Sequence, residues 1–409
     1  MVIASAVSQG ASGVRPATGQ REDFAECGIA IEADVDDVLA SEPLFARLSG
    51  QLGDALGRRL SVSLLMSGLH GDNAASRFES LCRRLGDALD APGTHTSALE
   101  ITIKGKDPDP ILAWRIRNKT LGTGALNIVG DERSVAADDF WQQLWQLREE
   151  PLVAAACWPH VRSPCQLLTP ECGGNVLPGM GLQAPSESAW VATSVSLQDF
   201  TDACGELDEE ALAATLNDIV AKLETIHRIA SWPTAAMQYD AWMNRRLAIQ
   251  VRDIGDYAVQ HGLDPEKHES LQSLRRILLR IRRVLRLESL RVARSTEMLP
   301  AIDLSNPARA LGGCPTKDGW EQRWLRAVDR TGVRHRNLLV LSPWSLFPSR
   351  DAATSFRDLA PLLRLADACV FRDRPSLSQW NVNQFKHFHQ GVWALTHHLE
   401  SNALVAERL

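Results

Sequence analysis

The sequence is poor in tyrosine, in close cysteine pairs and in long apolar runs, and each scarcity excludes a class of protein. Only two tyrosines occur in 409 residues, Tyr239 and Tyr257, so a mechanism that needs a tyrosine near either end of the chain is excluded. The eight cysteines include no CxxC pair, which argues against a zinc ribbon, a thioredoxin-like site or a disulfide scaffold. No run of about 18 apolar residues occurs, so no transmembrane helix is expected.

The charge balance and the N-terminal composition favour a cytoplasmic protein without membrane attachment. The net charge is -6, so a broad electrostatic grip on nucleic acid is not expected. Residues 1–22 are rich in Ala, Ser, Gly and Gln, and they lack both a basic n-region and a long apolar h-region. We therefore expect a disordered tail over 1–22 rather than a secretory signal, with the thiols kept reduced.

Hydrophobic periodicity predicts a mixture of helices and strands. Residues 34–92 show leucines at helical spacing, interrupted by a short apolar run at 60–66 that is a candidate strand. Alternating or β-branched runs predict strands over 98–104, 125–129, 190–197 and 337–341. Further helices are expected over 138–147, 208–229, 244–260, 266–294 and 381–400, and an irregular, proline-bounded loop over 157–189.

The helix expected over 266–294 is unusually basic, with eight arginines between Arg275 and Arg294. One interpretation is a nucleic-acid-binding face. The other is a solvated helix face, because arginine is a good helix former. The acidic balance of the whole chain favours the solvated face.

Two histidine patterns have spacings that occur at metal sites, but neither predicts one. His70-Gly71-Asp72 has the HxD spacing of a non-haem iron triad, yet its third ligand would have to come from far along the chain. The pairs His387-x-His389 and His397-His398 do not gather on one helix face. The sequence contains no GxGxxG, GxxxxGK or GxSxG motif, so the commonest nucleotide-binding and hydrolase signatures are absent.

Five segments between residues 98 and 350 carry a resemblance through their order and spacing. They are Ala125–Asp131, Ser163-Pro164-Cys165, Trp190–Phe200, Asn244–Leu263, and Gly332–His335 followed by Ser342-Pro343. Together they are similar to the catalytic barrel of the ribonucleotide reductase large-subunit family. The resemblance implies an α/β fold, with a ten-stranded α/β barrel of ribonucleotide reductase type over 96–409 and an N-terminal helical segment over 23–95.

The resemblance also implies a site. Cys165 matches the family cysteine that becomes a thiyl radical, although a free cysteine is more often a small buried hydrophobe. The implied substrate-binding residues are Ser163, Gln166, Trp190, Trp344 and Ser345. Leu167 stands where the family has a glutamate, and Trp190 stands where it has a second redox cysteine. Ordinary nucleotide reduction is not expected, because leucine moves no proton and tryptophan forms no disulfide.

The radical source and the function stay open. No tyrosine or glycyl-radical motif lies near the C-terminus, so adenosylcobalamin is the one familiar cofactor left, and no feature of the sequence shows its site. The favoured hypothesis is a divergent, oxidoreductase-like radical enzyme acting on a small molecule or nucleotide derivative. The alternatives are a radical-free descendant that binds or transforms its ligand, and a partner-directed interaction protein. The oligomeric state is not indicated.

Overall fold

The computed structural model of the chain describes residues 25–89, 99–105, 125–130, 139, 141–142, 145, 156–157, 175–176, 183–201, 206–264, 268–296, 319–340 and 381–383. The strands are β1 (Glu26–Asp34), β2 (Ser61–Ser67), β3 (Leu99–Gly105), β4 (Ala125–Gly130), β5 (Ala156–Cys157), β6 (Asn175–Val176), β7 (Gln183–Ala184), β8 (Ser188–Ser196), β9 (Arg246–Arg252) and β10 (Leu339–Val340). The helices are α2 (Val35–Ala40), α3 (Glu42–Gly57), α4 (Ala74–Leu89), α8 (Glu209–Ile229), α9 (Ala235–Asn244), α10 (Ile254–Gln260), α11 (His268–Ser295) and α13 (Gly319–Thr331), with a 3-10 turn at Leu197–Phe200. None of the described helices is long and apolar enough to cross a bilayer.

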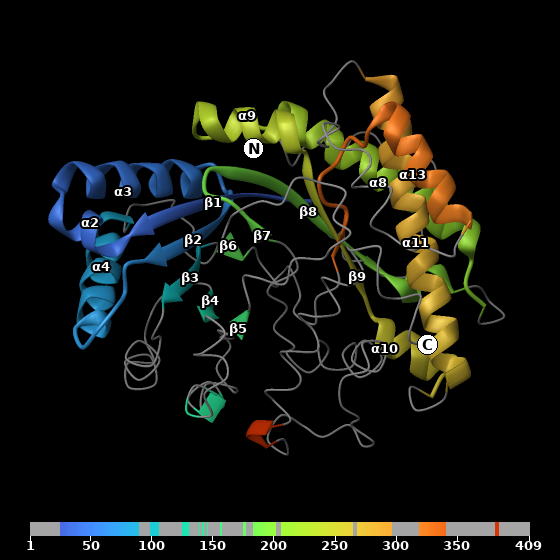
Figure 1. Cartoon of the computed structure of the whole chain (residues 1–409), viewed down its shortest axis with the longest axis horizontal. Helices are drawn as coiled ribbons and strands as arrows, with labels where there is room; N and C mark the ends of the chain where they lie inside the picture. The colour runs from blue at the N-terminus through green and yellow to red at the C-terminus, as the bar shows by residue number, and fades with distance from the viewer. Residues whose placement is uncertain are drawn as a thin grey trace.

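An eight-stranded mixed sheet organises the molecule, in the order β10-β9-β8-β1-β2-β3-β4-β5 (Figure 1). Strands β1 to β5 run parallel to their neighbours, and strands β8 to β10 run parallel to theirs. The two parallel sets meet at β1 and β8, which pair antiparallel from Glu26 opposite Ala192 to Ala30 opposite Ser188. Strands β6 and β7 form a separate small sheet.

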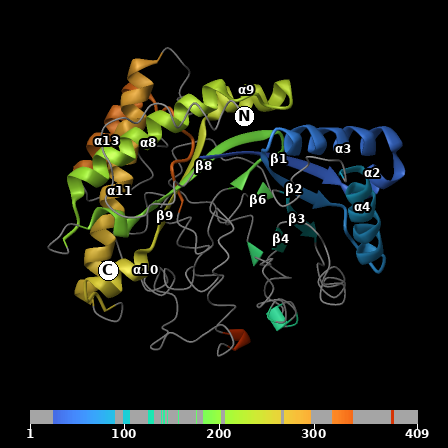
Figure 2. The ribbon, with the colours of Figure 1, turned by 180° about the vertical axis from the view of Figure 1, so that it is seen from behind.

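One face of the large sheet is apolar and covered by helices. Alternate side chains of β1, β2, β3, β8 and β9 form one hydrophobic core with residues of α2, α3, α4, α8, α9, α10 and α11. Figures 1 and 2 show α3, α8 and α9 along the same side of the sheet. Helix α13 lies against α11, where Leu290, Trp324, Val328 and Val333 form a second, smaller cluster.

Capping residues determine where helices begin and end. Asp34, the last residue of β1, accepts hydrogen bonds from the backbone N–H groups of Asp36 (3.0 Å) and Asp37 (3.2 Å), so α2 begins where β1 ends. Thr234 caps α9 in the same way, accepting from the N–H of Met237 at 3.1 Å. Arg245 ends α9 in the left-handed region, with φ 45°, and β9 begins at the next residue.

The ten-stranded barrel expected from the resemblance is wrong. Among the described residues the sheet has eight strands and is open, with β10 and β5 at its two edges. Alternating hydrophobicity identifies strands, but closure requires that the tilt and stagger of all the strands agree, and the sequence pattern does not specify these. The edge strands β10 and β5 have only two residues each.

Several local expectations are confirmed, and one is wrong. Strands β2, β3, β4 and β8 and helices α8 and α11 lie where the periodicity predicts them. The helix expected over 244–260 is wrong in its first half, which is β9, because Leu247, Ile249 and Val251 alternate into the core at the period of a strand. The segment 23–95 contains β1 and β2 as well as three helices, and the tail 1–22 lies outside the described residues.

Candidate functional site

Of the residues that the resemblance assigns to a site, only Trp190 is described. Cys165, Ser163, Gln166, Trp344 and Ser345 lie outside the described residues. Trp190 lies on β8 and is 1% exposed. It belongs to a small cluster with Ala30, Ala184, Ala192, Ala248 and Val340, which is separate from the main core.

The indole of Trp190 lies across β1 at Gly28. The two residues are register partners, and a Cβ atom added to Gly28 would lie 2.0 Å from Cζ2 of the indole and 2.2 Å from Cε2. Any side chain at this position would therefore displace the ring. The indole N–H is buried, and it has no hydrogen-bond acceptor in the described part of the chain. An indole N–H is only a donor, so within the described ranges this group is able to donate to an added acceptor.

Trp190 marks a second, polar face of the sheet, opposite the helix-covered core. Successive strand residues point to opposite faces, so the partners of the core residues line this face. On β8 and β9 they are Ser188, Trp190, Ala192, Ser194, Ser196, Arg246, Ala248, Gln250 and Arg252. Arg246, Gln250, Ser188 and Ser194 are all buried. On β2, buried Ser61 and Ser63 continue the face beyond β1.

An acidic residue of α9 holds the edge of this face in place. The carboxylate of Asp240 forms an ion pair with Arg246, and it also accepts a hydrogen bond from the N–H of Ala189 at 2.9 Å. Its second oxygen accepts from Nδ2 of Asn244 at 2.7 Å. One carboxylate therefore links α9 to β8 and orients the guanidinium at the start of β9.

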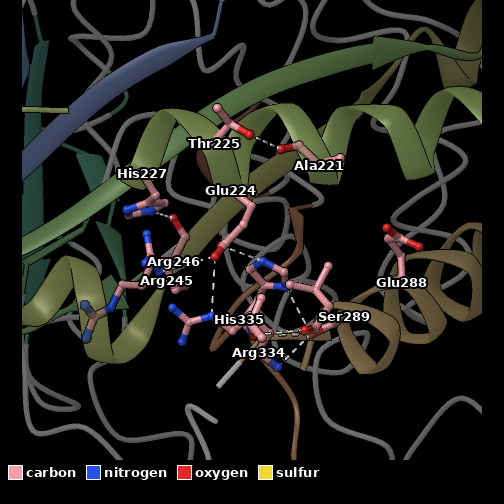
Figure 3. A network of polar contacts seen from close by, with 12 residues as sticks. Ala221, Glu224, Thr225, His227, Arg245, Arg246, Glu288, Ser289, Arg334 and His335 are labelled. Atoms are coloured by element: carbon pink, nitrogen blue, oxygen red, sulfur yellow. Dashed lines mark hydrogen bonds and ion pairs between the residues drawn. The ribbon is translucent and has the colours of Figure 1, made fainter. Parts of the chain in front are cut away.

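A buried network of charged and polar groups lies beside the core, between α8, α9, α11 and the segment after α13 (Figure 3). Glu224 on α8 accepts from Nε2 of His335 at 3.2 Å and lies near Arg334 (3.4 Å) and Arg245 (3.5 Å). Nδ1 of His335 lies 3.0 Å from Oγ of Ser289 on α11. Figure 3 shows Glu224, His335 and Ser289 joined in one line of contacts from α8 to α11.

The electrostatics of this network favour an ionised glutamate and neutral histidines. Burial raises the pKa of Glu224, but the hydrogen bond from His335 and the charges of Arg245 and Arg334 outweigh it and lower the pKa to about 2. Burial lowers the pKa of His335 against the opposing effect of Glu224. Burial also lowers the pKa of His227 to about 3, and Nε2 of this histidine donates to the carbonyl of Arg246 at 2.8 Å.

Serine, histidine and glutamate are the residue types of a nucleophilic triad, but this arrangement does not suit nucleophilic chemistry. Oγ of Ser289 accepts from the backbone N–H groups of Arg334 (3.1 Å) and His335 (3.2 Å). With His335 donating from Nε2 to Glu224, its Nδ1 accepts the hydroxyl proton of Ser289, so both lone pairs and the proton of Ser289 are engaged. Ser289 is also 0% exposed. The network therefore holds together four segments of the fold.

Among the described residues, no further side chain joins His70 and Asp72 in a group that could hold a metal ion. His70 and Asp72 lie in an exposed turn before α4, and the carbonyl of His70 accepts from Arg77 at 2.5 Å. The described ranges contain no group of three or more histidine, cysteine, aspartate or glutamate side chains that could hold a metal ion. The histidines at 387–398 lie outside those ranges.

No protein-family model and no curated protein sequence matches the chain. Sequence reasoning missed the polar face, although the alternation of Arg246, Ala248, Gln250 and Arg252 with apolar residues is visible in the sequence. It also missed Glu224 and Ser289, whose partners lie 111 and 46 residues away along the chain.

Proposed function

We propose that this protein binds a small anionic molecule on the polar face of its sheet, over β8 and β9. One observation carries the proposal: the face opposite the helix-covered core is lined by buried polar side chains. Parallel strands that are covered on both faces usually read as continuous apolar runs. Here the core face of β8 and β9 is largely apolar, whereas the other face carries serine, glutamine and arginine around a small apolar cluster of Trp190, Ala192 and Ala248.

The charge and hydrogen-bonding character of this face favours an anion. Burial of polar groups costs free energy unless hydrogen bonds compensate, so a buried polar face stabilises a core poorly. Polar groups that converge at a buried site are, in contrast, typical of ligand-binding sites. The face residues of β8 and β9 include no acidic residue and two arginines, of which Arg246 pairs with Asp240 and Arg252 lies away from Glu26, the acidic residue of β1 opposite Ala192. Guanidinium, amide, hydroxyl and indole groups all offer donors, which suit phosphate or carboxylate oxygens.

Trp190 and the small residues around it are suited to form the floor of a ligand-binding site. Gly28, Ala30, Ala192 and Ala248 place small side chains or none beside the indole on this face. Small residues let a ligand approach the backbone closely, and the indole adds a flat apolar surface with one N–H donor. An oxygen of the ligand would accept from this buried N–H, for which the described ranges contain no acceptor.

Arg252→Gln tests the proposal. Arg252 lies on the polar face opposite Ser196, and Arg83→Gln on the exposed side of α4 is the matched control with the same loss of charge. Binding of pyrophosphate, AMP and citrate is measured by calorimetry, with adenosine as the uncharged comparison. We expect at least one anion to bind the native chain and the control, and to bind the Arg252 variant about tenfold more weakly, as loss of a charged hydrogen bond predicts.

Two results would contradict the proposal. One is tighter binding of adenosine than of AMP, and the other is equal loss of affinity in the two variants. Radical chemistry at Cys165 is a separate hypothesis, which rests on the sequence resemblance alone. Cys165→Ser separates the two ideas, because it removes the thiol and leaves Trp190, Arg246 and Arg252 unchanged. Retention of anion binding is expected.

A further inference from the structure

The arginines of α11 divide into two groups that the sequence does not distinguish. Arg282 and Arg286 are buried, and Arg286 stacks over the ring of Trp324 on α13, with the guanidinium carbon 4.4 Å from the ring centroid. Arg283 stacks over Trp320 in the same way, at 5.1 Å. Arg283 and Arg286 thus pack α13 against α11 through cation–π contacts. The exposed arginines of α11 are Arg276, Arg280, Arg291 and Arg294.

The exposed arginines of α11 form one stripe. Their positions are separated by 4, 11 and 3 residues, and at about 100° per residue all four fall within a sector of about 60°. Leu287, which is 51% exposed, occupies the gap between them. From Arg276 to Arg294 the stripe is about 27 Å long, at 1.5 Å per residue.

Helix α13 places further exposed arginines beside this stripe. The contacts Arg283–Trp320 and Arg286–Trp324 advance together along both helices, so α11 and α13 run parallel. The two tryptophans fix which side of α13 faces α11. At about 100° per residue, the exposed arginines of α13 then point to the same side as the α11 stripe. These are Arg323, Arg326 and Arg330. Figures 1 and 2 both show the two helices side by side at one end of the molecule.

Most of this charge is not neutralised. Arg280 pairs with Glu209 at 3.6 Å and Arg291 pairs with Glu288 at 2.5 Å. The other five exposed arginines have no ion-pair partner in the described ranges: Arg276, Arg294, Arg323, Arg326 and Arg330. A chain with a net charge of -6 thus gathers uncompensated positive charge on one two-helix face. Such a concentration attracts a polyanion even when the whole molecule is acidic.

We propose that the face formed by α11 and α13 binds the phosphate backbone of a nucleic acid, independently of base sequence. Guanidinium groups recognise phosphates in bidentate geometry, and a straight row of them follows a regular polyanion. An anionic membrane fits this face less well, because interfacial helices insert an apolar side, whereas the apolar side of α11 is buried against the core. The negative net charge would oppose nucleic-acid binding if charge were spread evenly over the surface. Here the positive charge is concentrated on one face.

Fluorescence anisotropy with a labelled DNA duplex of about 20 base pairs tests the proposal, since this length exceeds the stripe at 3.4 Å per base pair. An RNA duplex of equal length and phosphatidylserine vesicles are run in parallel. We expect both duplexes to bind, with a log–log dependence of affinity on salt of about -4 to -6, as five to seven phosphate contacts predict. Absence of duplex binding at low salt, or binding to vesicles alone, would overturn the proposal.

Two double variants test whether both helices contribute. Arg276→Gln with Arg294→Gln removes two charges from α11, and Arg326→Gln with Arg330→Gln removes two from α13. Each should weaken duplex binding about tenfold and reduce the salt slope by about 2. Arg47→Gln with Arg83→Gln, on α3 and α4, removes two exposed charges elsewhere and should change neither quantity. If the variants of only one helix weaken binding, or if the control weakens binding equally, the proposal of a face shared by α11 and α13 is wrong.

Discussion

The carboxylate of Glu224 accepts a hydrogen bond from Nε2 of His335 at 3.2 Å, and it lies within 3.5 Å of the guanidinium nitrogens of Arg334 and Arg245. Three cationic or donor side chains thus share one carboxylate, which is contributed by α8. Because Glu224 is the shared anion, the four segments that meet at this point are coupled through a single residue.

Glu224→Gln should therefore destabilise the fold strongly. The amide keeps the shape of the side chain but leaves Arg245 and Arg334 without the carboxylate, and breaking a buried ion pair in this way costs about 3 kcal/mol or more. The free energy of unfolding is measured by urea denaturation. Glu210→Gln, at an exposed position in the first turn of α8, is the control and should change stability by less than about 0.5 kcal/mol. Equal effects of the two variants would refute the role given to Glu224.

The buried histidines predict how stability depends on pH. The pKa of His227 is lowered to about 3 in the folded chain, from a usual value of 6.5. The unfolded chain therefore binds the proton first, so the contribution of this residue to stability is complete above pH 6.5 and is lost as the pH falls towards 3. The slope is about 1.4 kcal/mol per pH unit for each such histidine, and His335 shifts in the same direction.

Urea unfolding between pH 8 and pH 5 measures this slope. We expect His227→Gln to make it shallower by about one proton, and His70→Gln, at an exposed position, to serve as the matched control. The loss due to Glu224 begins only below about pH 4.5, outside the pH 8 to 5 window, because its folded pKa is lowered to about 2. A slope that is unchanged in the His227 variant would contradict the burial of a neutral imidazole.

The close approach of Trp190 to Gly28 is testable by adding one methyl group. Gly28→Ala should displace the indole and cost about 2 kcal/mol or more, as overpacking of a filled site usually does. Trp190→Leu removes the obstructing ring, so the double variant should recover part of the loss. Gly50→Ala on α3 is the control, because no atom lies within 4 Å of the added Cβ and alanine favours a helix. If Gly28→Ala is also harmless, the indole does not lie across β1.

The sequence predicted the local elements better than their assembly, for physical reasons. Strands β3 and β8 alternate clearly, and α8 carries a continuous apolar stripe, so periodicity alone identifies them. Strand β9 was missed because it lies between two helices, α9 and α10, whose helical pattern dominates a longer window. The open order of the sheet and the pairing of β1 with β8, more than 150 residues apart, depend on contacts that no local pattern encodes.

The candidate sites show the same limit. Trp190 was selected because of the position it holds in a resemblance, yet its measurable property is its contact with Gly28, which follows from strand register. The eight arginines of α11 were visible in the sequence, but their division into packing and exposed groups depends on the position of α13. Glu224 lies between Leu223 and Ile226 on a helix, where a single polar residue is easily taken for part of the solvated face.

The cation–π contact between Arg286 and Trp324 provides the last prediction, because the proposed basic face depends on how α13 packs. Arg286→Met keeps a long side chain without the charge, and Trp324→Leu keeps an apolar residue without the aromatic face. A double-mutant cycle on the free energy of unfolding should give a coupling of about 1 kcal/mol, since the guanidinium lies 4.4 Å from the ring centroid and Arg286 is buried. The control cycle pairs Arg276 with Trp324. No contact between these two side chains is seen in the described structure, so their coupling should be near zero. Zero coupling in both cycles would show that α13 does not pack in this orientation, and the arginines of α11 and α13 would then not form one face.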